Sequence, residues 1–182
     1  MIKDFMTDIE SMGTNAGDAI LSIGVVPMDL ENRLLLKGFY TKISLESAQD
    51  AGFNIDAGTV MWWLQQDAAA RAEFDGNHAH PSISTALEKL SQFISSTAQV
   101  EDISEIRVWG NGVAMDNVLL NAAFDKCGIP RPWTHRGDMC YRTVKNLVPH
   151  VPRVAPTVPH HALFDAEAQA LTLFAQLDTL GL

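Results

Sequence analysis

The sequence predicts a single α/β domain built around a mixed sheet. The chain has 182 residues, a length that suits one compact domain spanning residues 1–182. Hydrophobic residues make up 47% of it and charged residues 19%, so it holds enough apolar material for a buried core. Strand-like segments come first, and helical segments then alternate with short strand-like ones, which is the element order of an α/β or α+β fold.

Five segments have the pattern of β-strands. The second is an apolar run rich in Ile and Val, which predicts a buried strand. Leu30–Arg33 reads as a hairpin turn, so the first three strands are expected to be antiparallel neighbours. The predicted strands are Lys3–Asp8, Ala19–Met28, Leu34–Ile43, Ile106–Trp109 and Asp138–Cys140, which together give a central mixed sheet of five strands.

Helices are predicted for most of the remaining chain. Asp56 has the residue type of an N-terminal cap, and Gly128 with Pro130 ends a later helix. Val148–Pro159 contains four prolines and is predicted to be a loop. The predicted helices are Val60–Gln66, Ala68–Phe74, Pro81–Ser96, Met115–Lys126, a short helix that ends near Leu147, and His161–Leu177.

Several functional classes are disfavoured by what the sequence lacks. No apolar run reaches the length that crosses a bilayer, so no membrane partner is expected. The first ten residues lack the basic start and long apolar stretch of a secretory signal. Cys127 and Cys140 form no metal-type cluster, and a reducing compartment fits them best. These features predict a cytoplasmic protein.

The charge of the chain is unevenly distributed. The net charge is −9, which by itself disfavours a protein that coats nucleic acid. The segment from Lys126 to Arg153, however, carries six basic residues against one acid, Asp138. A basic strip of this kind can hold a short single strand, or it can be an ordinary solvated face, and the sequence leaves both interpretations open.

Two acids lie side by side early in the chain, at Asp8 and Glu10. Residues i and i+2 of a strand share a face, so both carboxylates point the same way. Their repulsion near a core is costly unless a cation neutralises it, and oxygen ligands suit Mg²⁺ or Mn²⁺. Taken alone, the pair also fits an exposed acidic strand end.

Two later motifs supply further candidates. Asp116 follows the turn Gly110-Asn111-Gly112 and falls at the start of a helix, where a carboxylate is favourable for helix electrostatics alone. Asp165 is preceded by two adjacent histidines. Helical spacing would put His161 on the face of Asp165. Pro159 indicates that the helix only begins here, so His160 can instead lie on the preceding loop and act as a general base.

Together these motifs resemble the DEDDh-type 3′–5′ exonucleases of the ribonuclease H-like superfamily. The resemblance extends from about Phe5 to Ala170 and is closest in wording to the phage and bacterial exoribonuclease-like branch. It rests on DIESMGTNAGDAILSIG, TVMWWLQQDAAARAEF, WGNGVAMDNVLL and HHALFDAEAQA. Met115 and His161 depart from the family's usual residues, but no acid is missing.

The resemblance implies a ribonuclease H-like fold and a metal-dependent hydrolase that releases nucleoside 5′-monophosphates from the 3′ end of single-stranded RNA or DNA. The implied metal ligands of two Mg²⁺ or Mn²⁺ ions are Asp8, Glu10, Asp116 and Asp165, with His160 as the general base. The implied substrate-binding residues are Ile9, Ser11, Met12, Gly13, Trp63 and Asn111.

The two adjacent tryptophans are about 100° apart on a helix, so both cannot be central in one apolar stripe. At least one of Trp62 and Trp63 can border the cleft and stack on a base, while Trp63 also reads as a core residue. Trp109 and Trp133 are interpreted as structural.

The same residues bear on two alternative functions and on the oligomeric state. A non-catalytic nucleic-acid-binding module of the same fold would be expected to lack an acid or the histidine, and none is missing. A zinc hydrolase using His160 and His161 is disfavoured because adjacent histidines rarely reach one metal. Some related enzymes are dimers, and this analogy makes a homodimer an expectation only.

Overall fold

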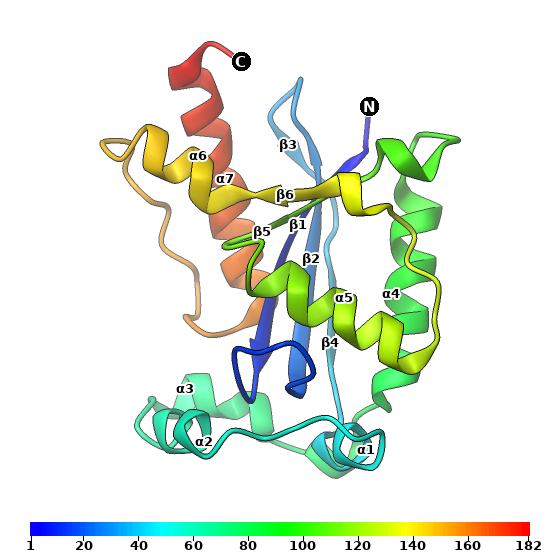
Figure 1. Cartoon of the computed structure of the whole chain (residues 1–182). Coiled ribbons are helices and arrows are strands. Elements are labelled where there is room, and N and C mark those ends of the chain that lie inside the picture. Colours follow the sequence, from blue (N-terminus) through cyan, green and yellow to red (C-terminus); the bar gives the residue numbers. More distant parts are fainter.

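The computed structural model describes residues 1–182 and confirms the α/β class (Figure 1). Its centre is a six-stranded mixed sheet in the order β3-β2-β1-β5-β6, with β4 also paired to β2. The strands are β1 Asp4–Ser11, β2 Ile20–Asp29, β3 Leu34–Leu35, β4 Phe39–Lys42, β5 Arg107–Gly110 and β6 Asp138–Cys140. β1 and β2 are antiparallel, whereas β5 runs parallel to β1 and β6 parallel to β5.

The count of five predicted strands is corrected to six, because the third predicted strand is split. β3 pairs with β2 through Met28 and Leu35, and β4 resumes the pairing through Val25 and Phe39. Between these pairs β2 supplies two residues and its partner three, so one extra residue interrupts the ladder. Pro27 lies in this stretch of β2 and has no N–H to donate.

The helices agree with the prediction except at their ends. Asp56 caps α2 as expected, because its Oδ1 accepts a hydrogen bond from the Thr59 backbone N at 2.8 Å. Only α1 has no counterpart among the predicted helices. The helices are α1 Leu45–Asp50, α2 Ala57–Trp63, α3 Ala68–Arg71, α4 Ile83–Thr97, α5 Asp116–Cys127, α6 Tyr141–Leu147 and α7 Ala162–Leu180.

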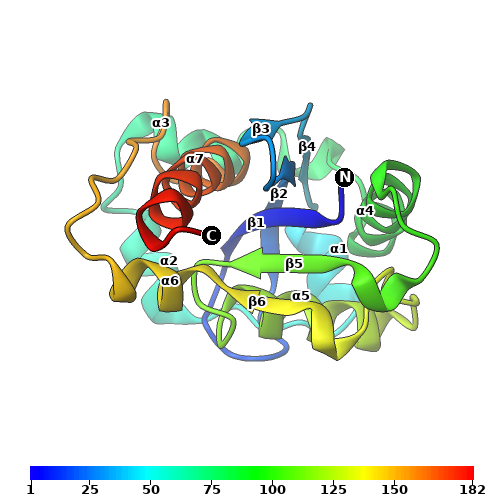
Figure 2. The ribbon, with the colours of Figure 1, turned by 90° about the horizontal axis from the view of Figure 1, so that it is seen from above.

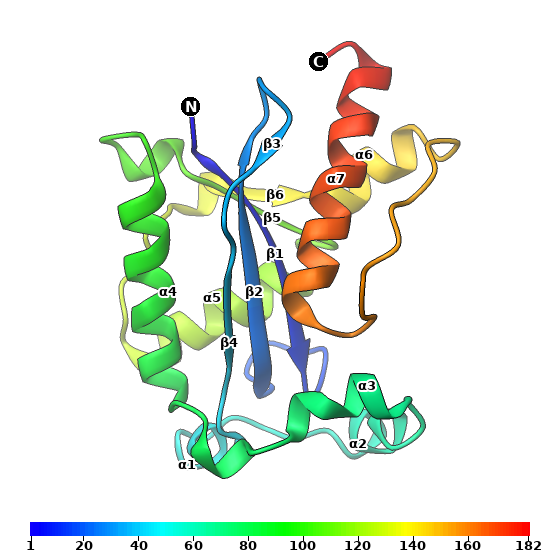
Figure 3. The ribbon, with the colours of Figure 1, turned by 180° about the vertical axis from the view of Figure 1, so that it is seen from behind.

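The sheet separates two apolar clusters. Figures 2 and 3 show α7 and α4 on opposite faces of the sheet. On β1, Phe5 and Ile9 pack into the cluster that includes α4 and α5, whereas Met6 packs against α7. Because side chains alternate along a strand, Asp8 and Glu10 share the α7 face with Met6.

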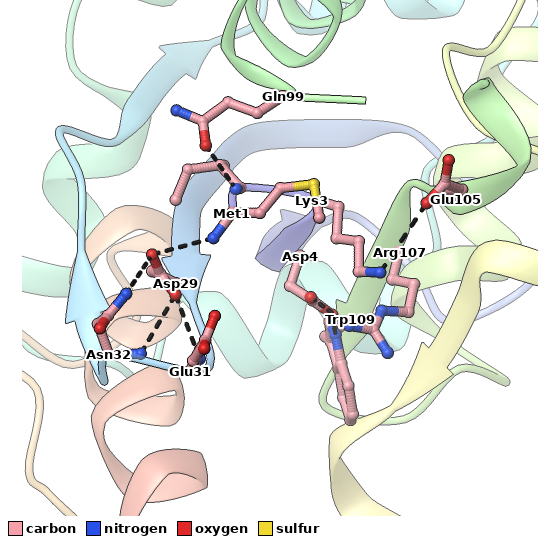
Figure 4. A network of polar contacts seen from close by, with 11 residues as sticks. Met1, Lys3, Asp4, Asp29, Glu31, Asn32, Gln99, Glu105, Arg107 and Trp109 are labelled. Carbon is pink, nitrogen blue, oxygen red and sulfur yellow. Dashed lines mark hydrogen bonds and ion pairs between the residues drawn. The ribbon is translucent and has the colours of Figure 1, made fainter. Parts of the chain in front are cut away.

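A polar network holds the start of β1, away from the Asp8 end (Figure 4). The buried Asp4 carboxylate accepts hydrogen bonds from Arg107 Nη2 at 2.5 Å and from Trp109 Nε1 at 2.8 Å. Both donors lie on β5, so this network fixes the β1–β5 pairing. It also gives Trp109 the structural role predicted for it.

None of the helices combines the length and the apolarity that a bilayer span requires.

Candidate active site

The centre of the site is a group of three carboxylates from two elements. Oxygen atoms of Asp8, Glu10 and Asp165 all lie within 4.8 Å of one another. Asp8 and Glu10 come from the α7 face of β1, and Asp165 comes from the first turn of α7. Asp165 follows Glu10 by 155 positions in the sequence, and the packing of α7 on β1 brings it to the two acids of the strand.

A glycine permits the close approach of α7 to the sheet. Gly24 on β2 pairs directly with Asp8 on β1. A Cβ atom at this glycine would overlap the main chain of Ala162 and Leu163 at the start of α7. The absence of a side chain at Gly24 therefore sets how near Asp165 comes to the two acids of β1.

Asp116 reaches the same cavity from the opposite face of the sheet. It is the first residue of α5, beyond the end of β5, and it is buried. A Cβ atom at Gly110 would lie 2.9 Å from Cβ of Asp116, so this turn too depends on a glycine. Asp116 lines the cavity but does not belong to the group of three carboxylates within 4.8 Å.

The structure separates the two histidines. His161 is the N-terminal cap residue of α7, and its ring stacks between Tyr40 and Phe164, each at 4.3 Å between centroids. His160 precedes the helix with φ of 59° and lines the cavity, its ring edge-on to Trp62 at 5.1 Å. The left-handed backbone of His160 thus turns this ring, and not that of His161, into the cavity.

The cavity has a volume of about 600 Å³ and opens beside the end of β1. It gathers all five residues predicted to be catalytic and five of the six predicted to bind substrate. Met12 is the exception, because its side chain is buried in the core beside Trp63 and Phe74. The predicted residues that line the cavity are Asp8, Ile9, Glu10, Ser11, Gly13, Trp63, Asn111, Asp116, His160 and Asp165.

The two neighbouring tryptophans occupy different environments. Trp63 is 3% exposed, and its Nε1 donates a hydrogen bond to the Ser11 carbonyl at 3.0 Å. Trp62 is 42% exposed and packs edge-on against Trp63 and His160. Trp63 therefore supports the wall of the cavity, and Trp62 is the ring with free area at its mouth.

Sequence reasoning missed several polar residues of the cavity, and Gln169 and Arg142 are the two that bear on its chemistry. Gln169 donates a hydrogen bond from Nε2 to Asp8 Oδ1 at 2.7 Å, and its spacing of four from Asp165 on α7 was a usable signal. Arg142 also lines the cavity, from α6. Nothing in the sequence distinguishes Arg142 from the other cations of the basic segment.

The packing of the acids strongly favours their protonated forms in the metal-free chain. Burial, followed by the charges of Asp116 and Asp165, raises the pKa of Asp8 well above its ordinary value. Burial, then Asp8 and Asp165, raises the pKa of Glu10 to about 10. Burial raises the pKa of Asp116 to about 6, and it also raises the pKa of Asp165. This repulsion is what a bound cation would relieve.

These shifts predict how the stability of the metal-free chain depends on pH. The acids bind protons more tightly when folded, so the free energy of unfolding falls as pH rises from the ordinary pKa of Glu10, 4.5, toward about 10. We expect Tm of the metal-free chain to be lower at about pH 8 than at about pH 5, and added Mn²⁺ to raise Tm more at the higher pH. Thermal unfolding with and without a chelator measures both effects.

Glu10→Gln is the control for this pH dependence. It removes the carboxyl whose pKa is raised to about 10, so the fall in Tm with pH should be visibly shallower in this variant. An equally steep fall in Glu10→Gln would show that the acid cluster is not its source.

The sheet, together with the acids and His160 gathered in one cavity, has the arrangement of the DEDDh-type 3′–5′ exonucleases. A family comparison agrees with this class. The chain belongs to the 3′-5′ exoribonuclease Rv2179c-like domain family, whose model matches residues 3–176. It is therefore a 3′–5′ exonuclease. No curated protein sequence matches the chain.

Solved structures show the same fold at low sequence identity. E. coli exonuclease I in complex with a dT13 oligonucleotide matches with a TM-score of 0.65 and 12% identity over 98% of this chain and 42% of that one. The nuclease domain of 3′hExo, a DEDDh family member bound to rAMP, matches with a TM-score of 0.63 and 12% identity over 97% and 92% of the two chains. The chain spans about 40% of the length of exonuclease I.

Proposed function

We propose that this exonuclease removes nucleoside 5′-monophosphates from the 3′ end of a single strand in a reaction that requires divalent metal ions. The observation that carries the proposal is the convergence of Asp8, Glu10 and Asp165 within 4.8 Å in the cavity that His160 also lines. Carboxylates this close, with pKa values raised by burial and mutual repulsion, are a poor arrangement for a chain without cations.

The donor set fits hard divalent cations. It consists of carboxylate oxygens without a cysteine, which suits Mg²⁺ or Mn²⁺ better than softer metals. Asp8, Glu10 and Asp165 would hold the ions directly, and Asp116 would support the second ion from the far side of the group. When bound, two such ions would polarise the scissile phosphate and lower the pKa of a bound water.

His160 is the residue proposed to accept the proton of the attacking water. Its ring faces the cavity from the loop before α7, and the edge-on contacts with Trp62 and Trp63 hold its orientation. An imidazole at this position can accept the proton and pass it to solvent at the cavity mouth.

The cavity suits one nucleotide at a time. Its volume of about 600 Å³ lies within the range of small-ligand sites. Ser11, Gly13, Thr14 and Thr59 line the side toward α2, where the 3′-terminal nucleotide would lie, and Trp62 would contact its base. The description of the matched family favours RNA as substrate, while exonuclease I was solved with DNA oligonucleotides.

The proposed function is tested with 3′-labelled RNA and DNA strands of one sequence, assayed with Mg²⁺, Mn²⁺ or a chelator. Release of labelled mononucleotides with either metal and none with the chelator is expected. Activity that persists in the chelator would contradict the metal requirement. The strand, RNA or DNA, that is degraded faster in the same assay identifies the preferred substrate.

The proposed role of His160 can be tested by substituting it and, as a matched control, the adjacent His161. We expect His160→Ala to lower kcat by roughly 10²- to 10⁴-fold, because it removes the general base. His161→Phe keeps a ring in the stack with Tyr40 and Phe164, so its kcat should stay within a few-fold of the wild type. Single-turnover cleavage of a labelled strand measures both. The assignment would be wrong if His161→Phe caused the larger loss.

A further inference from the structure

A group of cations on one side of the site has no acidic partner. Arg142 and Lys145 lie on α6, three residues apart and so on the same face of the helix, and Arg153 lies on the loop that follows. No carboxylate comes within 4.0 Å of any of the three, although acids outnumber bases in the chain as a whole. Burial, followed by the charges of Arg153 and Arg142, lowers the pKa of Lys145. The three positive charges therefore lie close enough to act on one another, and none of them forms an ion pair with a carboxylate.

Two of these side chains are held in place by the turn after β5. Arg142 Nη2 donates a hydrogen bond to the Asn111 carbonyl at 2.7 Å, and Lys145 Nζ donates to Asn111 Oδ1 at 3.2 Å. Gly112 has φ of 133°, and a Cβ atom there would come within 3.1 Å of the Arg142 guanidinium. The turn thus leaves room for this guanidinium against its backbone.

Arg142 is the only Lys or Arg side chain that lines the cavity. It is exposed, and one of its five N–H donors is engaged by Asn111. The remaining donors form the planar fork that binds phosphate oxygens in pairs.

The position of Arg142 indicates that it would contact a phosphate other than the scissile one. The scissile phosphate belongs at the three carboxylates within 4.8 Å of one another. Arg142 lines the same cavity from α6, where it is hydrogen-bonded to the Asn111 carbonyl in the turn that precedes Asp116. Residues of both α2 and α6 line the cavity. Figure 1 shows these two helices apart from each other, with α6 beyond the end of β5 and α2 beyond the end of β1. A strand with its 3′ nucleotide toward α2 therefore leaves the cavity past Arg142.

We propose that Arg142, supported by Lys145, forms a subsite for the phosphate immediately 5′ of the scissile bond. This inference rests on the proposed function and adds to it a binding site for the second phosphate of the substrate. The subsite places a cation outside the group of three carboxylates, where its charge attracts the negatively charged strand toward the cavity.

Two dinucleotides that differ by one group test this subsite. The first has only its internucleotide phosphate, and the second carries an additional 5′-phosphate in the position assigned to Arg142. We expect the wild type to show a higher kcat/KM for the 5′-phosphorylated dinucleotide, by roughly ten- to hundredfold, the usual effect of a hydrogen-bonded charge pair. Arg142→Gln should lose most of this preference, and Arg142→Lys should keep part of it.

The remaining outcomes of this experiment are also decisive. Arg136→Gln makes the same charge change on an exposed residue outside the cavity, and it should retain the preference. A wild type without any preference, or an Arg142→Gln loss that is equal for both dinucleotides, would overturn the subsite. A wild type that cleaves neither dinucleotide nor a longer strand would instead count against the proposed function.

Discussion

Asp8→Asn is expected to abolish catalysis while stabilising the metal-free chain. The substitution removes one proposed metal ligand and keeps an oxygen that can accept the Gln169 hydrogen bond at Asp8 Oδ1. We expect kcat/KM to fall by about three orders of magnitude, since the charge that holds the cations is lost. Without metal, Tm should rise by roughly several degrees, because one member of a repelling group becomes neutral.

The two effects are measured by mononucleotide release with Mn²⁺ and by thermal unfolding in a chelator. Asp125→Asn makes the same chemical change at a residue that is 71% exposed and outside the cavity, so it should alter neither quantity appreciably. Near-normal activity of Asp8→Asn would show that the carboxylate cluster does not take part in the reaction.

Gly24→Ala is expected to damage stability and activity together. The new methyl group would overlap the main chain of Ala162 and Leu163, so the first turn of α7 must move away from β2. Overpacking of this kind costs about 1–3 kcal/mol of stability. The same movement carries Asp165 and His160 away from β1, and a misplacement near 1 Å can lower activity by about a hundredfold.

Gly38→Ala is the matched control for this substitution. Its Cβ would also meet Leu163, but at the tip of a flexible side chain that can rotate away, and its distance to the main chain, 3.0 Å to the Val25 carbonyl oxygen, is longer than the corresponding distance at Gly24. Chemical denaturation and single-turnover kinetics should therefore show a clearly larger loss for Gly24→Ala. Equal losses in the two variants would mean that the approach of α7 at Gly24 is not what positions the site.

The acids could be selected as candidate site residues from the sequence because each belongs to a short local motif. Asp8 and Glu10 are two apart on a strand, and Asp165 belongs to a short His-containing motif at a helix start. The family resemblance already favoured His160 over His161, and the structure adds why the His160 ring faces the cavity: α7 begins after both residues, and the backbone of His160 is left-handed. Spacing on an ideal helix favoured the other residue.

What the sequence did not reveal depends on contacts between distant segments. Gln169 and Arg142 have no motif of their own, and each is placed by the packing of its helix. The direction of the Met12 side chain follows from the bulge between Glu10 and Ser11, where the β1–β2 register shifts. The predicted number of five strands was wrong because the extra residue between β3 and β4 does not change the apolar pattern of the sequence in a recognisable way.

The interruption between Leu35 and Phe39 has a consequence for how the chain behaves at high concentration. Long, regular outer strands offer free N–H and C=O groups on which a second chain can assemble. Here the outer boundary beyond β2 consists of a two-residue strand and a four-residue strand that are out of step with each other. Neither is long enough to template a continuous intermolecular ladder, so this irregularity protects the exonuclease against aggregation through that border.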